Sequence, residues 1–430
     1  MKAILGPATL LWALLPTIAA APTPVTAAEP APDVAMIEGE GESTRYWSRW
    51  RGPSGQGYVE GAGYVDRWGP DENVLWKVAV PGRGNSSPIV WGDRIFLTTA
   101  QDDGSERSIL AFRRADGKLL WRATAPGGLA ERAHRKNGHA SGTATTDGER
   151  IYAFLGNHGL LAVDFDGEQV WHQNLGPTSN YHGPASSPLL YEDRVIVVQD
   201  QRNNAFVAAF DKLTGRELWR TPRTQKVGWN SPIAIRAGDR DEIVVSGQNQ
   251  VQAYDPGTGE ELWRAKGSTF EVIPSPVVGH GLVFCSSGRA GPTLAIRPGG
   301  SGDVTDTHVV WSAAKGSPFV PAPILVGDLL YLVNDMISVV TIYDARTGEV
   351  LDQERLGSAA RESFSAAAVL VDGKVFVTND QGETFVLRAG PEVEILHVND
   401  IGERTLASPA LVDGHWYIRT AEHLWAIGTG

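Results

Sequence analysis

One stretch recurs along this chain and constrains its fold more than any other feature. It is most complete in A-F-D-K-L-T-G-R-E-L-W (Ala209 to Trp219) and in A-Y-D-P-G-T-G-E-E-L-W (Ala253 to Trp263). Asp211 can accept hydrogen bonds from turn amides, and Gly215 can adopt the positive φ that tight turns often need. The second copy has the same residue types at these two positions, Asp255 and Gly259. Each copy therefore predicts two β-strands joined by a tight turn.

Three weaker copies keep the spacing of this hairpin: Ala111 to Trp121, Ala162 to Trp171 and Thr341 to Asp352. The tryptophan follows the turn glycine by four residues in four copies, and Asp352 stands at that position in the fifth. Large aromatic side chains at a fixed register are expected to anchor a core. The expected repeat anchors are Trp76, Trp121, Trp171, Trp219, Trp263, Asp211, Asp255, Gly215 and Gly259.

A second signature precedes each hairpin: a small residue followed by proline or another small residue, an apolar strand, a turn and a second strand. Its eight copies begin at Ser86, Gly142, Ser186, Asn230, Pro274, Pro321, Ala366 and Ala407. Most intervals are 41 to 47 residues, and four short antiparallel strands per such period are typical of a propeller blade. The sequence therefore predicts an all-β fold, an eight-bladed β-propeller of four-stranded antiparallel blades.

The two ends of the chain complement each other. The last signature is followed by one further strand, H-L-W-A-I (His423 to Ile427), and N-V-L-W-K-V (Asn73 to Val78) resembles an orphan outer strand. Pairing the two would close the ring and remove its exposed edges. We expect Trp76 to share a blade with Trp416 and Trp425.

The N-terminal region is expected to direct export. Residues 1–28 combine a basic start, an apolar run and small residues, so they predict a cleaved signal peptide, with a periplasmic or extracellular location and no transmembrane span after cleavage. Residues 29–46 are rich in Ala, Pro, Glu and Gly and predict a disordered linker. Residues 47–430 form the predicted propeller domain, with Trp47 to Tyr58 packing as a loop against its outside. The single cysteine, Cys285, excludes an intramolecular disulfide.

The charge of the chain argues against nucleic acid as a partner. Its formal net charge is −12, and it contains no run rich in Lys and Arg. Binding to a phosphate backbone depends on such clusters.

The A-x-D-x-x-T-G-x-x-x-W hairpin closely resembles the repeat of the pyrroloquinoline quinone (PQQ)-type eight-bladed propellers. The resemblance covers about residues 47–430 and implies that the tryptophans dock successive blades together. That superfamily contains quinoprotein alcohol dehydrogenases and non-catalytic members such as the BamB-like propellers of outer-membrane assembly. The catalytic branch carries a vicinal disulfide below the quinone, which a chain with one cysteine cannot make, and this chain also lacks a C-x-x-C-H haem motif.

The resemblance therefore implies a BamB-like scaffold that binds a protein partner or an extended peptide segment, with no cofactor and no catalytic residues. The alternative is a dehydrogenase that uses PQQ and Ca²⁺ to oxidise alcohols or sugars. We expect a monomer.

The candidate binding site lies in the loops that connect the blades. The richest polar stretch, R-A-H-R-K-N-G-H-A-S-G-T, precedes the inner strand of the second blade and contains Arg132, His134, Arg135, Lys136, Asn137 and His139. An anionic ligand or a partner segment could dock there, and a solvated loop with local turn bonds is the alternative. Other connecting loops contribute Arg83, Asn85, His182, Trp229, Arg361 and Arg404.

No metal site is expected. His134 and His139 are five residues apart on a loop without a nearby carboxylate cluster, which does not match a zinc site. The aspartates of the hairpins recur from blade to blade, so turn capping explains them better than calcium binding.

Overall fold

The computed structural model describes residues 33–289, 291–314, 316–357 and 363–430. The predicted signal peptide, residues 1–28, lies outside them. Within the described residues, no helix is both long and apolar enough to cross a bilayer.

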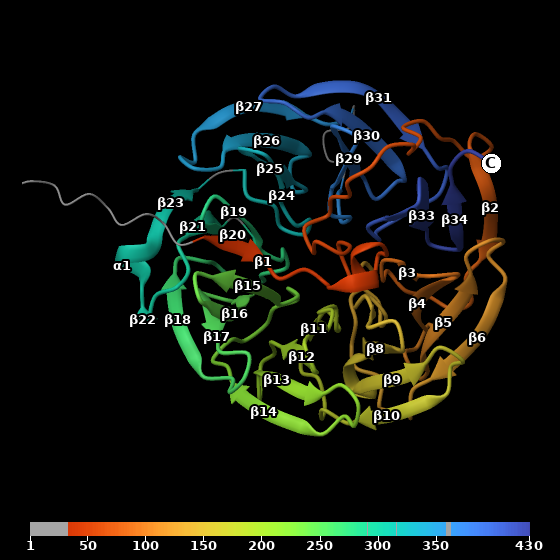
Figure 1. The fold of residues 1–430 in the computed structure, drawn as a ribbon, viewed down its shortest axis with the longest axis horizontal. Coiled ribbons are helices and arrows are strands. Elements are labelled where there is room, and N and C mark those ends of the chain that lie inside the picture. The colour runs from red at the N-terminus through yellow and green to blue at the C-terminus, as the bar shows by residue number, and fades with distance from the viewer. Residues whose placement is uncertain (1–32, 290, 315, 358–362) are drawn as a thin grey trace, which may run out of the picture. The chain divides into compact units, whose positions relative to one another are not determined.

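Eight antiparallel blades form a ring, as the sequence predicts (Figure 1). Blades 1 and 2 comprise β3 (Ile89–Trp91), β4 (Arg94–Ala100), β5 (Arg107–Arg113) and β6 (Leu119–Thr124), then β7 (Thr145–Thr146), β8 (Arg150–Phe154), β9 (Leu160–Asp164) and β10 (Gln169–Gln173). Blades 3 and 4 comprise β11 (Leu189–Tyr191), β12 (Arg194–Gln199), β13 (Phe206–Asp211) and β14 (Glu217–Pro222), then β15 (Ile233–Ala237), β16 (Arg240–Ser246), β17 (Gln250–Tyr254) and β18 (Glu261–Lys266).

Blades 5 and 6 comprise β19 (Val277–Gly279), β20 (Leu282–Ser286), β21 (Thr293–Ile296) and β23 (Val309–Ala313), then β24 (Ile324–Val326), β25 (Leu329–Asn334), β26 (Val339–Asp344) and β27 (Val350–Arg355). Blades 7 and 8 comprise β28 (Val369–Val371), β29 (Lys374–Thr378), β30 (Glu383–Arg388) and β31 (Glu394–Asp400), then β32 (Ala410–Val412), β33 (His415–Arg419), β34 (His423–Ile427) and β2 (Val74–Ala79). The remaining elements are β1 (Val34–Met36), β22 (Gly302–Asp303), α1 (Thr305–His308) and the 3₁₀ turns η1 (Gly41–Thr44) and η2 (Gly156–His158).

The ring closes as expected. Strand β2 pairs antiparallel with β34, and Trp76 lies opposite Ala426. Trp76, Trp416 and Trp425 therefore share blade 8. Figure 1 shows the C-terminus beside β2.

Five tryptophans link their blade to the next. The indole N–H of Trp219 donates to the Pro256 carbonyl, 3.0 Å away, in the hairpin turn of blade 4. Four other tryptophans make the same bond to the following blade: Trp76, Trp121, Trp171 and Trp311. Trp311 joins this set although its hairpin does not match the repeat in sequence.

The turn glycine is required by this contact as well as by the turn. Gly215 has φ +72, and a Cβ there would lie 2.7 Å from the indole of Trp171. Asp211 Oδ1 accepts bonds from the amide and the hydroxyl of Thr214, both at 2.8 Å. These bonds lower the pKa of Asp211 and cap the turn. In blade 1, Asp116 stands where other copies have the turn threonine, so it pairs with Arg113 instead.

Blades 4 and 6 depart from this pattern. Trp263 is fully buried and donates to Glu242 Oε2 within its own blade, at 2.7 Å, while β22 pairs alongside it. Asp352 replaces the tryptophan in blade 6, and its Oδ2 accepts a bond from the Val393 amide of blade 7, at 2.7 Å. The connection to the next blade is kept there by a carboxylate.

The N-terminal segment corrects two sequence predictions. Residues 34–36 form β1, which pairs with the inner strand β15, so the linker predicted for residues 29–46 does not hold in this part. The loop from Trp47 to Tyr58 does not pack against the outside: the Trp47 carbonyl accepts a bond from Val90, at 2.8 Å, and the Ser48 carbonyl accepts one from Thr146, at 3.0 Å.

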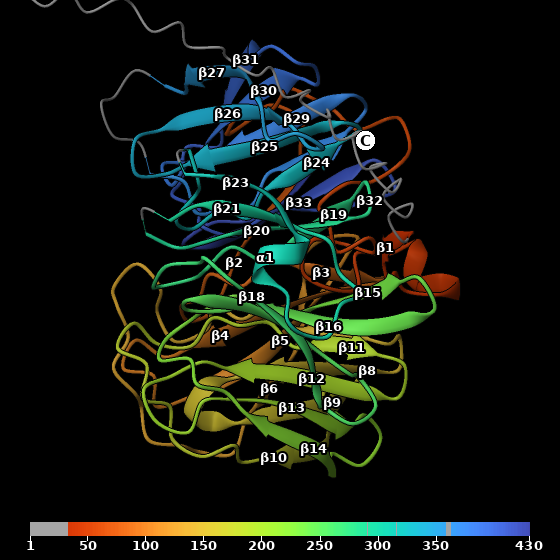
Figure 2. The same cartoon turned by 90° about the vertical axis from the view of Figure 1, so that its left-hand side faces the viewer.

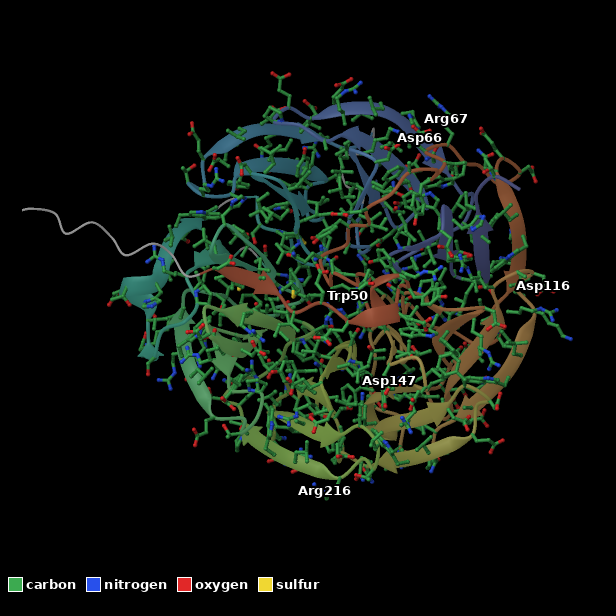
Figure 3. All side chains as sticks on the ribbon, viewed as in Figure 1. Trp50, Asp66, Arg67, Asp116, Asp147 and Arg216 are labelled. Carbon is green, nitrogen blue, oxygen red and sulfur yellow. The ribbon has the colours of Figure 1, made fainter. Side chains whose placement is uncertain are left out.

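The same loop reaches the opposite blades. The Arg51 guanidinium donates to the Pro323 carbonyl at 2.7 Å, and Gln56 Oε1 accepts a bond from the Val278 amide at 2.8 Å. Backbone bonds join Gly57 to Leu370. The loop satisfies edge groups that the inner strands would otherwise leave unpaired. Figure 2 shows β1 at one end of the channel, and Figure 3 places Trp50 near the middle of the ring.

We expect Trp219→Ala to lower the free energy of unfolding by about 3 to 5 kcal/mol, because it removes a buried indole and an inter-blade bond. Trp50→Ala is the matched control and should cost less, because Trp50 is half-buried beside a cavity. Chemical denaturation measures both values. Equal denaturation midpoints for the two variants would contradict the role of the repeat tryptophan.

We also expect a chain that begins at Tyr46 to lose protection along β15, because β1 covers its edge. Hydrogen exchange at Arg236 and Gly238, whose amides point toward β1, should speed up relative to a chain that begins at Asp33. Amides of β33, in the opposite blade 8, provide the internal control. Unchanged exchange in β15 would show that β1 contributes nothing to the blade.

Candidate binding site in the central channel

Small residues before the inner strands form a ring of hydrogen bonds around the channel. The Ser187 amide donates to Ser231 Oγ, and the Ser231 amide donates to Ser275 Oγ, each at 2.9 Å. Equivalent bonds run from Ser87 to Thr143, Thr143 to Ser187, Ala367 to Ser408 and Ser408 to Ser87. We call these six side chains the hydroxyl belt: Ser87, Thr143, Ser187, Ser231, Ser275 and Ser408.

The hydroxyl belt lines a cavity of about 380 Å³. Trp50 also lines it, and the loop that contains Trp50 crosses the end of the channel where β1 lies. The walls come from the blade-connecting loops at the other end, with exposed His134 and Met336 at the rim. The cavity is therefore a cup, closed by residues 47–58 and open on the loop face.

Aromatic and imidazole rings form one wall of the cup. The His182 ring stacks on His134, with centroids 4.9 Å apart and planes at 21°. On its other side lies Trp229, 5.3 Å away, whose indole N–H donates to the Gly183 carbonyl at 2.8 Å. Burial, followed by the neighbouring His134, lowers the pKa of His182. The lowered pKa favours the neutral form of the His182 ring, which faces the cavity.

The charged groups of the wall are mostly compensated. Lys136 Nζ lies 2.9 Å from Asp380 Oδ2 and also donates to Ser363 Oγ. Arg289 lies over the Phe319 ring, 5.2 Å from its centroid. Burial raises the pKa of Asp335, although it accepts a bond from the Phe319 amide at 2.8 Å.

The loop between β6 and β7 lies in the longest interval between two copies of the second signature, from Ser86 to Gly142, and side-chain bonds hold it in place. Arg107 and Glu131 form a buried, two-point ion pair at its base. Asn85 Nδ2 donates to the carbonyls of Lys136 and Asn137. Asn137 Nδ2 donates in turn to the His182 carbonyl, at 2.8 Å, so this loop is tied to its neighbours on both sides.

The structure brings half of the predicted site residues together. Six of them line the cup: Asn85, His134, Lys136, Asn137, His182 and Trp229. Arg132 and Arg135 are exposed beside it, and no ion pair of either is found among the described residues.

The remaining predicted residues lie elsewhere. Arg83 forms an exposed ion pair with Asp102, at 2.6 Å, and His139 lies 3.2 Å from Arg107 at the base of the interval. Arg404 lines a smaller pocket beside Asn85. Arg361 falls outside the described residues.

Sequence reasoning missed the floor of the cup. The small residues before the inner strands were recognisable as a repeat. The sequence around them did not show that their hydroxyls bond the neighbouring blade. Nothing in the sequence indicated that Trp50 lines the cavity, because its position depends on bonds that other residues of its loop make. Asp335 and Arg289 lie in loops that carry no repeat.

The residues present do not fit a calcium-bound PQQ. Among the described residues, no three His, Cys, Asp or Glu side chains gather to hold a metal ion. Lys136 is already paired with Asp380, so the wall offers little free positive charge to a tricarboxylate. Cys285 is buried in blade 5, where burial raises the pKa of its thiol to about 12.

Comparison with known proteins gives relatives with different roles. Outer membrane protein assembly factor BamB of Burkholderia pseudomallei is 25% identical over 274 residues, 62% of this chain and 65% of its own length. A polyvinylalcohol dehydrogenase of Pseudomonas is 25% identical over 238 residues, 51% of this chain and 32% of its own length. The chain thus spans less than two thirds of either relative.

Solved structures share the fold at low identity. BamB from Moraxella catarrhalis superposes with a TM-score of 0.59 and 15% identity, covering 82% of this chain and 98% of its own. A quinohemoprotein alcohol dehydrogenase from Pseudomonas putida gives 0.63 and 12%, covering 90% and 81%. The model of the family described as outer membrane protein assembly factor BamB matches residues 60–201, 105–227 and 203–428. The repeat, the eight blades and this match over most of the chain show that the protein belongs to the BamB-like branch of the PQQ-like propeller family.

Proposed function

We propose that this protein is an exported scaffold that binds an extended segment of another protein at the mouth of the central cup. The observation that carries the proposal is a group of exposed apolar side chains on the loop face. Phe270, Met336 and Ile337 are 47%, 46% and 46% exposed. Exposed apolar clusters beside a cavity are typical of protein-binding surfaces.

The topology places these side chains on one face. The loop before each inner strand and the loop between the second and third strands of a blade emerge at the same end, because neighbouring strands are antiparallel. Phe270 lies in a loop of the first kind, whereas Met336 and Ile337 lie in one of the second kind. Met336 also lines the cup, so the exposed pair Met336 and Ile337 borders the cavity.

Two further observations support a binding role. The relative named as an assembly factor matches more of this chain than the named dehydrogenase does. The cup also combines aromatic walls with backbone-bonded polar groups, which suits recognition of a chain segment by a rigid surface.

Site-specific photo-crosslinking tests the proposal. A benzophenone amino acid at Ile337 should form crosslinks to one extended segment of a partner in the native host. The same probe at Leu213, which is 52% exposed in the hairpin turn at the opposite end of blade 3, is the matched control and should give none. Equal products from both positions would contradict a loop-face site.

Reconstitution with PQQ and Ca²⁺ tests the catalytic alternative in the same preparation. Dye-linked turnover on alcohols, sugars or polyvinyl alcohol would favour the dehydrogenase. We expect no turnover, because the donor set around the cup does not match the cofactor.

Replacing the cations beside the cup with alanine should affect the stability of the protein to different extents. The double variant Arg132→Ala, Arg135→Ala should retain the wild-type denaturation midpoint, because both side chains are exposed, and should bind an acidic partner segment more weakly at low salt. Lys136→Ala should lower the free energy of unfolding by about 1 to 3 kcal/mol, because Asp380 would keep a buried carboxylate without its cation. Unchanged affinity in the double variant would show that these arginines belong to a solvated loop.

A further inference from the structure

We propose that the hydroxyl belt is an oxyanion subsite at the closed end of the cup and that it takes the carboxylate of an inserted ligand. The inference rests on the proposed function for the source of that carboxylate, the end of an extended segment. It adds the chemistry by which the segment is recognised.

The hydroxyl protons of the belt are not used in hydrogen bonds among the described residues. Each of its six oxygens accepts a bond from the backbone amide of a neighbouring blade. Within the described part of the chain, none of the six hydroxyls donates a bond in return. A hydroxyl carries one proton to donate, so six donors face the cavity without a protein acceptor.

Burial makes these donors significant. The six residues are between 2% and 8% exposed, and all line the cavity. A buried polar group without a partner is costly, so each hydroxyl needs an acceptor from whatever fills the cup. Accepting an amide bond also polarises the hydroxyl and strengthens it as a donor.

A carboxylate suits this arrangement better than a ligand rich in donors. It accepts bonds at about four lone-pair sites and donates none when ionised. The surroundings limit the opposing charge. Asp380 is paired with Lys136, and Asp335 accepts bonds from the Phe319 and Val320 amides, while burial raises its pKa.

The closed floor restricts what can reach the belt. Residues 47–58 cross the channel, and Trp50 lines the cup beside the belt. A chain cannot thread through this end of the ring. A terminal carboxylate or a single acidic side chain can enter, because the volume of about 380 Å³ is at the small end of ligand pockets.

The belt itself supplies the variants for a test. In the two blades without a belt hydroxyl the equivalent positions are alanines, Ala322 and Ala367, so alanine is accommodated there. Thr143 shows that threonine also fits. The double variant Ser187→Ala, Ser231→Ala removes two donors, Ser187→Thr, Ser231→Thr retains them, and Ala322→Ser adds one.

Calorimetric titration with succinate, and with uncharged succinamide as the matched control, measures the subsite directly. We expect succinate alone to bind. Its Kd should rise at least about tenfold in the alanine variant, stay within about twofold in the threonine variant, and fall in Ala322→Ser. Binding of succinamide as tight as that of succinate, or an unchanged Kd in the alanine variant with its fold confirmed by circular dichroism, would overturn the proposal.

Titrations with peptides identify the source of the carboxylate. Hexapeptides with a free C-terminus should bind more tightly than succinate and lose that gain when amidated. If they bind no better than succinate, the subsite stands and its natural ligand is a small carboxylate. If free and amidated peptides bind equally and the alanine variant changes neither, the subsite is refuted while the scaffold function stands.

Discussion

Contact between neighbouring blades is the interaction on which the rest of the structure depends. A four-stranded blade cannot bury both of its faces alone, so each needs a fixed position against the next. At the outer rim this position comes from an indole N–H that reaches the turn carbonyl of the following blade, as from Trp219 to Pro256. Near the axis it comes from the amide-to-hydroxyl bonds of the belt, such as Ser187 to Ser231. The blades are thus joined at two radii, which leaves the connecting loops free to differ and to carry the site.

Where one kind of contact is missing, another takes its place. The belt lacks hydroxyls at Ala322 and Ala367, and the N-terminal loop bonds the same part of the ring through Arg51 and Pro323 and through Gly57 and Leu370. At the rim, Asp352 replaces a tryptophan and still reaches the next blade. The ring tolerates irregular repeats because each blade has several independent bonds to its neighbours.

The fold was predictable because its signals are local. Glycine and aspartate mark each turn, and the unpaired strand around Trp76 has one natural partner at the other end of the chain. The N-terminal loop was not predictable, because it binds through backbone groups whose partners lie up to several hundred residues away, as Gly57 and Leu370 do. The candidate site lay between these cases: loop residues such as His182 and Trp229 were identified by their chemistry, whereas the hydroxyls of the belt acquire their meaning only from the adjacent blade.

The two alanines of the belt have a consequence for orientation. A complete ring of eight equivalent donors would hold an oxyanion on the axis but would favour no direction around it, so the rest of the ligand could leave the cup toward any blade. Ala322 and Ala367 make these directions unequal, because blades 1 to 5 and 8 carry belt donors and blades 6 and 7 do not. The imidazole stack of His134 and His182 lies among the donor-bearing blades, and Met336 lies on the side without donors. A propeller built from near-identical parts thereby becomes asymmetric about its axis, with belt hydroxyls at six blades and none at the two blades that carry the alanines.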